Sequence, residues 1–487
     1  MPLQFNQYSV NPNGKLTAVL STVGKKAGAF KLNNIFVSAA QKNDKILPVH
    51  CVAQSDLDGM PSEAKIWADL NGFDGAVGNV LLVPAENGQS INMVLLGVGD
   101  ATDPFVTGAL AKKLPNTPFT FASLAGLDLR LAAIGFGLGS YRFDVYKKSS
   151  QRIPQLVLGD MLDRDEILRH VESSWLARDL INTPAEDMGP DEIEAASRKL
   201  AKSYKASIKI IKGDALLSNN FPMIHAVGRA ATKAPRLIDF TWGDKKAPKL
   251  TLVGKGVAFD TGGLDIKPAS SMRNMKKDMG GAANILALAR IIMDAKLNVR
   301  LRVLIPAVEN AIAGNAFRPG DILRSRKGLT VEIGHTDAEG RLVLGDALTL
   351  ASEEKPDLII DMATLTGAAR VALGPELPPY YTNDEALAAA VDEAAVSERD
   401  PLWRMPLWQN YNQALASTVA DLNNVTTDGF AGSITAGLFL QRFVDPAVSW
   451  AHFDIFGWNP SAKPHSPVGG EAQGIRAIFA SLQKRYA

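Results

Sequence analysis

The chain has 487 residues, enough for two or more domains. Its apolar fraction of 46% and charged fraction of 21% are those of a globular protein with large cores, and its single cysteine, Cys51, excludes an internal disulfide and a cysteine-based zinc site. The 52 basic and 51 acidic residues leave a net charge of +1, which argues against nucleic acid or an anionic membrane as the main partner.

The first third of the chain predicts an independent α/β unit. An apolar run covers residues 45–53, and the apolar stretches 80–83 and 93–99 predict a buried strand pair around a turn at 86–88. The glycine-rich stretch 135–139 lacks the G-x-G-x-x-G spacing, so we expect no dinucleotide site there.

A polar stretch at 147–152 ends this unit. The periodicity of residues 163–182 predicts a connecting helix that ends before Pro184. We therefore predict an N-terminal α/β domain over residues 1–160, a connecting helix within 161–185 and a larger α/β domain over 186–487.

The sequence predicts neither a targeting segment nor a membrane span. Residues 1–15 lack the basic-then-apolar pattern of a secretory signal, and we find no apolar run of about 18 residues or more. A single cysteine also fits a reducing, intracellular setting. We therefore expect a cytoplasmic protein.

The larger domain alternates strands with helices. The predicted strands are residues 207–211, 249–253, 299–305, 329–333, 358–361 and 450–455. The predicted helices are residues 191–206, 282–295, 342–354 and 386–398. This alternation predicts a mostly parallel central sheet covered on both faces, with a functional site at the carboxyl ends of its strands.

One short segment between a predicted strand and a predicted helix carries three charges, on Asp337, Glu339 and Arg341. While the backbone stays extended, residues at i, i+2 and i+4 share one face, so we expect these side chains to point the same way. Two carboxylates so close suggest a metal site. An acidic turn that caps a helix, with a solvated arginine, is the alternative, and this segment alone leaves both open.

A second charged segment follows strand 249–253. Lys255 and Asp260 lie just past the strand end among glycines, and Lys267 comes seven residues after Asp260. The pattern G-x-x-x-x-G-K-[ST] is absent, so a phosphate loop is weakly supported. Asp278 stands where an N-cap belongs, and a lone aspartate there is most often only a cap.

Taken together, the acidic residues indicate a single site. Asp260, Asp278, Asp337 and Glu339 all fall at strand ends or a helix start of the predicted sheet. Four converging carboxylates repel one another and cannot all stay ionised, whereas two divalent cations would resolve the repulsion. Oxygen-rich ligation suits magnesium, manganese or zinc, and the absence of H-E-x-x-H argues against a thermolysin-like site.

These segments resemble the cytosol (leucyl) aminopeptidases. The most specific signature of that family is N-T-D-A-E-G-R-L, and residues 335–342 match it at seven positions. Its other motif looks like residues 253–268, and Asp278-Met-Gly-Gly-Ala-Ala matches as well. Supporting similarities lie at residues 177–184, 314–321, 361–368 and 450–454, and in the first domain mainly at 139–143.

The resemblance implies a role for each matching residue. Asp260 and Glu339 would bridge two metal ions. Lys255 and Asp278 would complete the shell of one ion, and Asp337 that of the other. The implied catalytic pair is Lys267 and Arg341, with a bicarbonate ion held at Arg341. The residues that match the pocket for the first substrate side chain are Met275, Thr364, Leu365 and Gly367.

The same resemblance implies an exopeptidase that releases amino-terminal residues from peptides with a free N-terminus. Water activated by two divalent ions, manganese or zinc, would attack the scissile carbonyl, and the Lys267 ammonium would stabilise the oxyanion. A homo-oligomer, specifically a hexamer, is implied by the resemblance alone.

The residues disfavour two alternatives to this function. A catalytically inactive binding or scaffold protein on the same fold is disfavoured because all seven charged key positions are present. A different binuclear metallohydrolase, such as a phosphoesterase, is disfavoured because histidine is nearly absent from the motifs.

His335 departs from the family pattern, which has asparagine at this position. On an extended backbone its ring would share a face with Asp337 and Glu339. Three roles stay open: an additional metal ligand, a ring that orients a ligand through a hydrogen bond, or a packed ring that replaces an amide.

Overall fold

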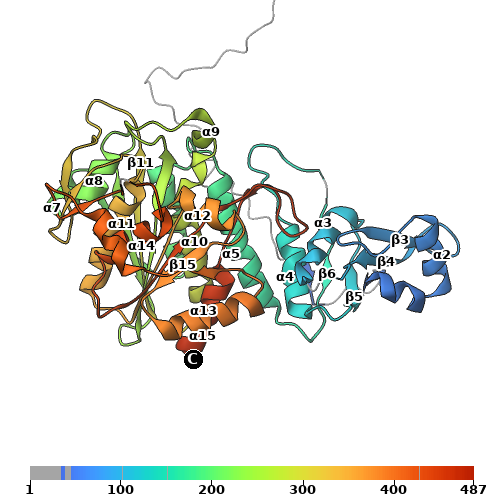
Figure 1. The fold of residues 1–487 in the computed structure, drawn as a ribbon. Coiled ribbons are helices and arrows are strands. Elements are labelled where there is room, and N and C mark those ends of the chain that lie inside the picture. The colour runs from blue at the N-terminus through green and yellow to red at the C-terminus, as the bar shows by residue number, and fades with distance from the viewer. Residues whose placement is uncertain (1–34, 39–44, 101–102, 151, 427) are drawn as a thin grey trace, which may run out of the picture.

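The computed structural model describes residues 35–38, 45–100, 103–150, 152–426 and 428–487. A smaller domain from the first part of the chain lies beside a larger domain formed by the rest (Figure 1). Residues 1–15, where the sequence predicts no secretory signal, lie outside the described residues. Within the described part, no helix has both the length and the apolar character needed to cross a membrane.

A six-stranded sheet in the order β1-β6-β5-β2-β4-β3 forms the smaller domain. Its strands are β1 (Phe36–Val37), β2 (Leu47–Val52), β3 (Val80–Pro84), β4 (Ile91–Gly97), β5 (Phe119–Ser123) and β6 (Leu156–Val157). The predicted strand pair is confirmed, because β3 and β4 pair antiparallel with Val80 opposite Leu96, while the other neighbouring strands run parallel. The α-helices of this domain are α2 (Ser62–Leu70), α3 (Leu110–Lys113) and α4 (Leu129–Gly139).

The glycine-rich stretch 135–139 lies within helix α4. A Cβ atom on Gly139 would lie 2.5 Å from the Cα of Gly108, in the 3-10 helix η3 (Pro104–Ala109). A Cβ on Gly135 would lie 2.8 Å from the Cα of Phe105. These glycines therefore let α4 pack closely against η3.

Helix α5 (Arg164–Asn182) lies between the two domains and confirms the helix predicted over 163–182. Asp163 caps it by accepting two backbone N–H groups of the first turn, and the helix ends two residues before Pro184. It contacts α4 in the smaller domain and α10 (Gly280–Asp294) in the larger one. The exact domain limits stay a prediction.

The larger domain is built on a nine-stranded sheet in the order β16-β15-β18-β14-β9-β11-β8-β7, with β10 beside β11. Its strands are β7 (Ser207–Lys212), β8 (Arg236–Trp242), β9 (Lys249–Gly254), β10 (Gly256–Asp260), β11 (Arg300–Asn310), β14 (Leu358–Ala363), β15 (Pro379–Thr382), β16 (Trp403–Arg404) and β18 (Ser449–Asp454). The central strands β18, β14, β9 and β11 run parallel, which confirms the predicted class. Towards the edges, β15 and β8 run antiparallel to their inner neighbours.

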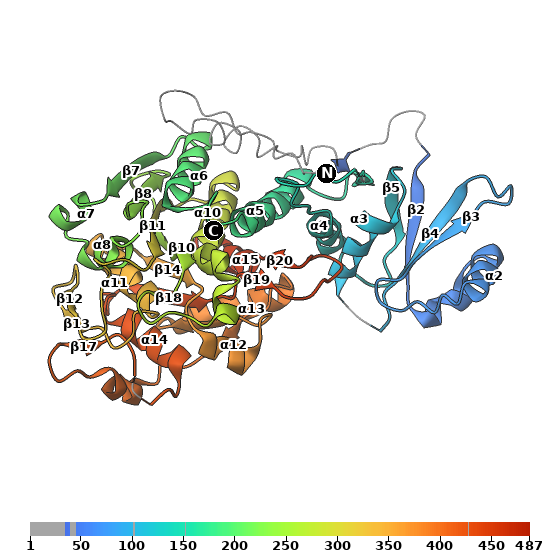
Figure 2. The same cartoon turned by 90° about the horizontal axis from the view of Figure 1, so that it is seen from above.

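One predicted strand belongs to a different sheet. The sequence predicts 329–333 as part of the central sheet, but β13 (Thr330–Glu332) pairs with β12 (Ile322–Arg324) and β17 (Leu422–Asn423) in a separate three-stranded sheet. This sheet lies at the side of the larger domain away from the smaller one (Figure 2). In β13 only Val331 is buried, a pattern that fits a small surface sheet better than a strand covered on both faces.

Helices cover both faces of the central sheet. Alternate residues of β14 show this, since Leu358 and Ile360 belong to one core and Ile359 to the other. The first core includes α6 (Pro190–Ser203), α10, α13 (Glu385–Ser397) and α15 (Ile475–Arg485), and the second includes α8 (Pro222–Gly228), α11 (Glu339–Glu353) and α14 (Gly432–Gln441). Helix α11 begins three residues before the predicted start at 342, because an acidic residue is favoured in the first turn of a helix.

Candidate active site

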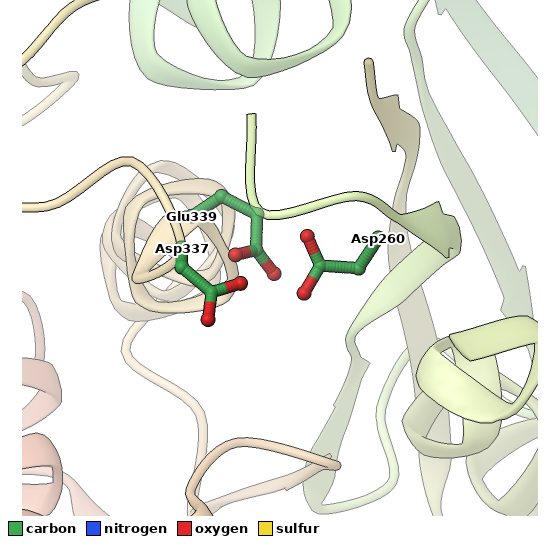
Figure 3. Close-up of side chains that lie close together, drawn as sticks. All are labelled: Asp260, Asp337 and Glu339. Carbon is green, nitrogen blue, oxygen red and sulfur yellow. The ribbon is translucent and has the colours of Figure 1, made fainter. Parts of the chain in front are cut away.

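The predicted acidic residues lie where the loops around the central sheet meet. Asp260 ends β10, Asp278 lies in the 3-10 helix η4 (Met275–Met279), and Asp337 lies in the turn between β13 and α11. Glu339 begins α11. Figure 3 shows the carboxylates of Asp260, Asp337 and Glu339 directed toward one another.

These three carboxylates form a tight cluster. Each of Asp260, Asp337 and Glu339 offers one oxygen, and the three oxygens lie within 4.8 Å of one another. Asp260 and Glu339 are only 3% and 1% exposed. Glu339 Oε2 meets no donor from the described residues, whereas Glu339 Oε1, Asp278 Oδ2 and Asp337 Oδ1 each lie against a lysine ammonium. Buried carboxylates this close repel one another unless cations lie among them, so the site is suited to receive cations.

The interpretation of Asp278 as a helix cap is wrong. Helix α10 has Met279 at its N-cap position and no capping side chain. Asp278 instead accepts a hydrogen bond of 2.8 Å from Thr364 Oγ1 and lies 2.8 Å from Lys255 Nζ. The 3-10 turn that precedes α10 directs this carboxylate into the interior.

The backbone at Asp337 is a turn and not the extended segment that the sequence analysis expects. The Ala338 N–H donates to the His335 carbonyl at 3.3 Å, and α11 then begins at Glu339. The turn still gathers Asp337 and Glu339. Arg341 follows Glu339 by two residues in α11, and the charge of Glu339 acts on its guanidinium.

Arg341 is buried against the segment that carries Asn424. Its guanidinium donates to the Asn424 carbonyl at 2.6 Å and lies 5.9 Å from the centroid of the Phe439 ring. Burial lowers the pKa of Arg341 to about 10, although Glu339 and Asp454 act in the opposite direction.

Two lysines bring positive charge to the cluster. Lys255 Nζ lies 2.8 Å from Asp278 and 3.0 Å from Glu339. Lys267 Nζ lies 2.8 Å from Asp260 and also contacts Asp337. Burial alone would lower the pKa of each lysine, but the neighbouring carboxylates outweigh it and raise both pKa values above the usual range.

The carboxylates respond unequally to this environment. Burial and the charge of Asp260 raise the pKa of Glu339 to about 8 and that of Asp337 to about 6. Burial also acts to raise the pKa of Asp260, but Lys267 and Lys255 outweigh it and hold that pKa below its usual value. Divalent cations would take over the stabilising role that protons have here, so the donor set fits a metal site.

Two asparagines without a predicted role hold the site loops. The Asn310 amide donates to Asp260 Oδ1 at 2.9 Å and to the Thr336 carbonyl at 3.2 Å. The Asn424 side-chain oxygen accepts the Gly334 and His335 N–H groups at 2.8 and 3.2 Å, and its amide donates to the His335 carbonyl at 2.8 Å. Neither lies within a charged motif, so spacing gave no signal for them.

The predicted pocket residues lie on two segments. Met275 begins η4, Thr364 and Leu365 follow β14, and Gly367 begins α12 (Gly367–Leu373). Asp454, at the end of β18, organises the second segment, since its carboxylate accepts the Leu365 N–H at 3.1 Å and a hydroxyl of the next residue at 2.5 Å. Its position at the end of a strand in the parallel sheet is the sequence signal for such a role.

Lys277 is a third lysine at the site and had no predicted role. It lies between Lys276 and Asp278 in η4 and is buried. Burial lowers the pKa of Lys277 to about 8, with a smaller opposing effect from Asp278. Its Nζ lies 4.6 Å from the centroid of the Phe456 ring.

His335 lies at the edge of the site with its side chain 49% exposed. Its Nδ1 accepts the Asp337 N–H at 3.1 Å and lies 3.6 Å from Asp265 Oδ2. The ring is not part of the described cluster of potential metal ligands. This contact supports an orienting role, which stays a prediction.

Comparison with known proteins gives concordant matches over both domains. The description "Cytosol aminopeptidase family, catalytic domain" matches residues 175–479, and "M17 aminopeptidase, N-terminal domain" matches 48–159. A probable cytosol aminopeptidase of Corynebacterium efficiens is 38% identical over 435 residues, which cover 85% of this chain and 86% of the relative.

Two solved structures are similar to the whole described fold. The crystal structure of the cytosol aminopeptidase from Coxiella burnetii has a TM-score of 0.88 and 47% identity, and the match covers 93% of this chain and 100% of that one. The bottromycin maturation enzyme BotP, solved in complex with Mn, has a TM-score of 0.83 and 32% identity, with 91% and 99% covered.

Proposed function

The chain belongs to the cytosol aminopeptidase family and is a hydrolase that removes amino-terminal residues from peptides, and we propose that Asp260, Asp337 and Glu339 form the centre of its metal-dependent active site. The cluster of these three carboxylates is the observation that carries the proposal. The alternative of an inactive binding protein gains no support, because every charged position of the family pattern keeps its residue.

Five residues would hold two divalent cations. These residues are Lys255, Asp260, Asp278, Asp337 and Glu339. The support is the buried carboxylate cluster, whose members already have cations, the ammonium groups of Lys255 and Lys267, as partners. Lys255 would bind as a neutral amine, after losing the proton that Asp278 and Glu339 stabilise. Manganese and zinc both suit such donors, and the Mn complex of the similar BotP favours manganese.

The chain's own residues would prepare the scissile carbonyl for attack by water. When bound, the cations would supply Lewis acidity toward water and toward that carbonyl. The Lys267 ammonium would stabilise the negative charge that develops on the carbonyl oxygen. The buried guanidinium of Arg341 would hold an anion such as bicarbonate. A free, neutral α-amine would be within reach of the cations that these residues hold, which restricts cleavage to the first peptide bond.

The direct test is release of leucine from leucine amide. Chelation should abolish it, and manganese, zinc or cobalt should restore it. N-acetylated leucine amide should resist cleavage, because an amide nitrogen has no free lone pair with which to bind a metal ion. Full activity in exhaustively metal-free protein would refute the proposed site.

Three broader features complete the proposal. A homohexamer is supported by family membership alone, and light scattering should detect a particle six times the 52.1 kDa of one chain. A stable active monomer would refute it.

A cytoplasmic location is supported by the name of the relatives. The division into residues 1–160, 161–185 and 186–487 is supported by the matched ranges 48–159 and 175–479, and limited proteolysis that cuts first near 160 would test it.

A further inference from the structure

Lys277 is a buried lysine whose ammonium meets no anion. The residue is 7% exposed, and no hydrogen bond or ion pair from the described residues reaches its Nζ. Its close partner is the Phe456 ring, whose centroid lies 4.6 Å from Nζ. A cation–π contact compensates only part of the cost of burying an ammonium. Lys277 therefore differs from Lys255 and Lys267, which both contact carboxylates.

The carboxylates nearest to Lys277 are engaged elsewhere. Asp278 pairs with Lys255 at 2.8 Å and is a proposed metal ligand. Asp454 pairs with Arg370 at 3.2 Å and accepts two backbone N–H groups. Among the described residues, no carboxylate is therefore available to pair with Lys277, and an anionic group of a bound ligand can do so.

Lys277 also adjoins the proposed pocket for the first side chain. It lies in η4, which begins at the pocket residue Met275. The ring that it contacts, Phe456, precedes Gly457, where a Cβ atom would lie 3.3 Å from Thr364 Cγ2. The ammonium is therefore placed beside two segments that the substrate's first residue would touch.

We propose that Lys277 selects peptides with an acidic first residue by binding the side-chain carboxylate of an amino-terminal glutamate or aspartate. This inference rests on the proposed function, in which Met275 and Thr364 line the pocket. An ammonium–carboxylate hydrogen bond is charge-assisted and strong in a buried site. A site built around such a contact discriminates against a neutral isostere, because the buried cation is then left unpaired. The same cation repels an amino-terminal lysine or arginine.

The first experiment uses the wild-type enzyme loaded with manganese. Hydrolysis of the dipeptides Glu-Ala, Gln-Ala, Lys-Ala and Leu-Ala is compared by kcat/KM. Glu-Ala should exceed Gln-Ala on the order of 10- to 100-fold, mostly through KM, and Lys-Ala should be the poorest substrate. Equal values for Glu-Ala and Gln-Ala would overturn the inference without any variant.

Three variants locate the preference. Lys277→Met keeps the length of the side chain and removes its charge, so the Glu-Ala to Gln-Ala ratio should fall toward one. Lys277→Arg keeps a cation and should keep a ratio above one, which provides a test even if the methionine variant does not fold. Lys276→Met is the matched control, because the Lys276 ammonium donates to the Asn182 carbonyl at 2.7 Å, and its ratio should equal that of the wild type. An unchanged ratio in Lys277→Met, or an equal loss in Lys276→Met, would overturn the inference.

Bound metal and chelator sensitivity separate this inference from the proposed function. If Leu-Ala hydrolysis needs metal but Glu-Ala and Gln-Ala are treated alike, Lys277 is not a specificity residue and the metal site stands. If hydrolysis of every dipeptide survives complete metal removal, the proposed metal site itself fails.

Discussion

Both domains have parallel strands covered by helices, but the acidic residues near their strand ends differ in burial and in partners. In the smaller domain Asp56 follows β2, is exposed and accepts the Ala53 N–H at 2.8 Å. In the larger domain Asp260 ends β10, is 3% exposed and lies between Asn310 and Lys267. Asp56 stabilises a turn, whereas Asp260 is one of several buried carboxylates that repel one another.

The difference in burial between Asp56 and Asp260 indicates which of the two domains carries the active site. A solvated aspartate that caps a turn stabilises the fold locally. A group of buried carboxylates with few donors destabilises the fold unless cations complete it. Architecture therefore does not distinguish the two domains, but the burial of like charges does.

The largest expected effect comes from removing one charge of the cluster. Glu339→Gln keeps the shape of the side chain but removes the negative charge, so bound metal should fall and kcat/KM should drop by roughly 1,000-fold or more. Asp56→Asn is the matched control, and it should keep both metal and activity. Metal analysis and leucine amide hydrolysis measure the outcome. A fully metallated, active Glu339→Gln enzyme would remove the distinction between the two domains.

A second test separates residues that bind metal from residues that act on the substrate. Lys267→Ala and Arg341→Ala should lower turnover by about 100- to 1,000-fold, because each removes a positive charge proposed to stabilise an anion. Metal content should stay near that of the wild type. If elemental analysis finds that Lys267→Ala has lost both ions, the role assigned to Lys267 is wrong.

A third test concerns the loop that presents Asp337 and Glu339. Asn424→Ala removes the hydrogen bonds that hold the turn at His335, so activity should fall by about 10- to 100-fold through misplaced ligands. Asn423→Ala is the control, since the Asn423 side chain accepts the nearby Val425 N–H at 3.1 Å. Comparable losses in both variants would indicate a general defect of this loop.

The sequence predicted well whatever depends on local pattern. The strand pair β3–β4, helix α5 and the central parallel strands followed from apolar periodicity and turn signals. The sequence also predicted that Asp260, Asp337 and Glu339 converge, and the cluster forms, although β13 before Asp337 belongs to a separate sheet.

Other features depend on contacts that a pattern does not encode. Periodicity identifies a strand but not its partner, so residues 329–333 were assigned to the wrong sheet. The extended backbone expected at Asp337 is wrong, because a turn and the first residues of α11 take its place. Asn424 and Lys277 are single residues whose importance comes from partners far along the chain or from the lack of one.

A smaller effect is expected from a buried group outside the site. His170 in α5 is 3% exposed, and burial, with Arg130 and Arg476, lowers its pKa from 6.5 to about 3. Between those values the unfolded chain binds a proton that the folded chain does not, so stability falls as pH drops through this window. His170→Leu removes this proton uptake. From pH 7 to pH 5 the wild type should therefore lose about 2 kcal/mol more unfolding free energy than the variant.

Urea unfolding at both pH values, on metal-loaded enzyme, measures this difference. Activity of the folded variant at pH 7 should match the wild type, because His170 lies in the helix between the domains and not in the site. An identical pH dependence in both proteins would show that His170 does not titrate as its burial implies.

The smallest effect is expected at His335. Like the Asp56 carboxylate, its side chain accepts a nearby backbone N–H. The His335 ring accepts the N–H of the residue two positions on, and an asparagine side chain at the same position can accept that N–H in an Asx turn. His335→Asn should therefore keep both metal ions and lower activity by less than about threefold, whereas His335→Ala loses the contact and should cost about fivefold. Bound metal and turnover of both variants decide the matter. Loss of one metal equivalent in His335→Asn would show that the ring is a ligand, because only coordination, and not the orientation of one backbone N–H, would remove an ion.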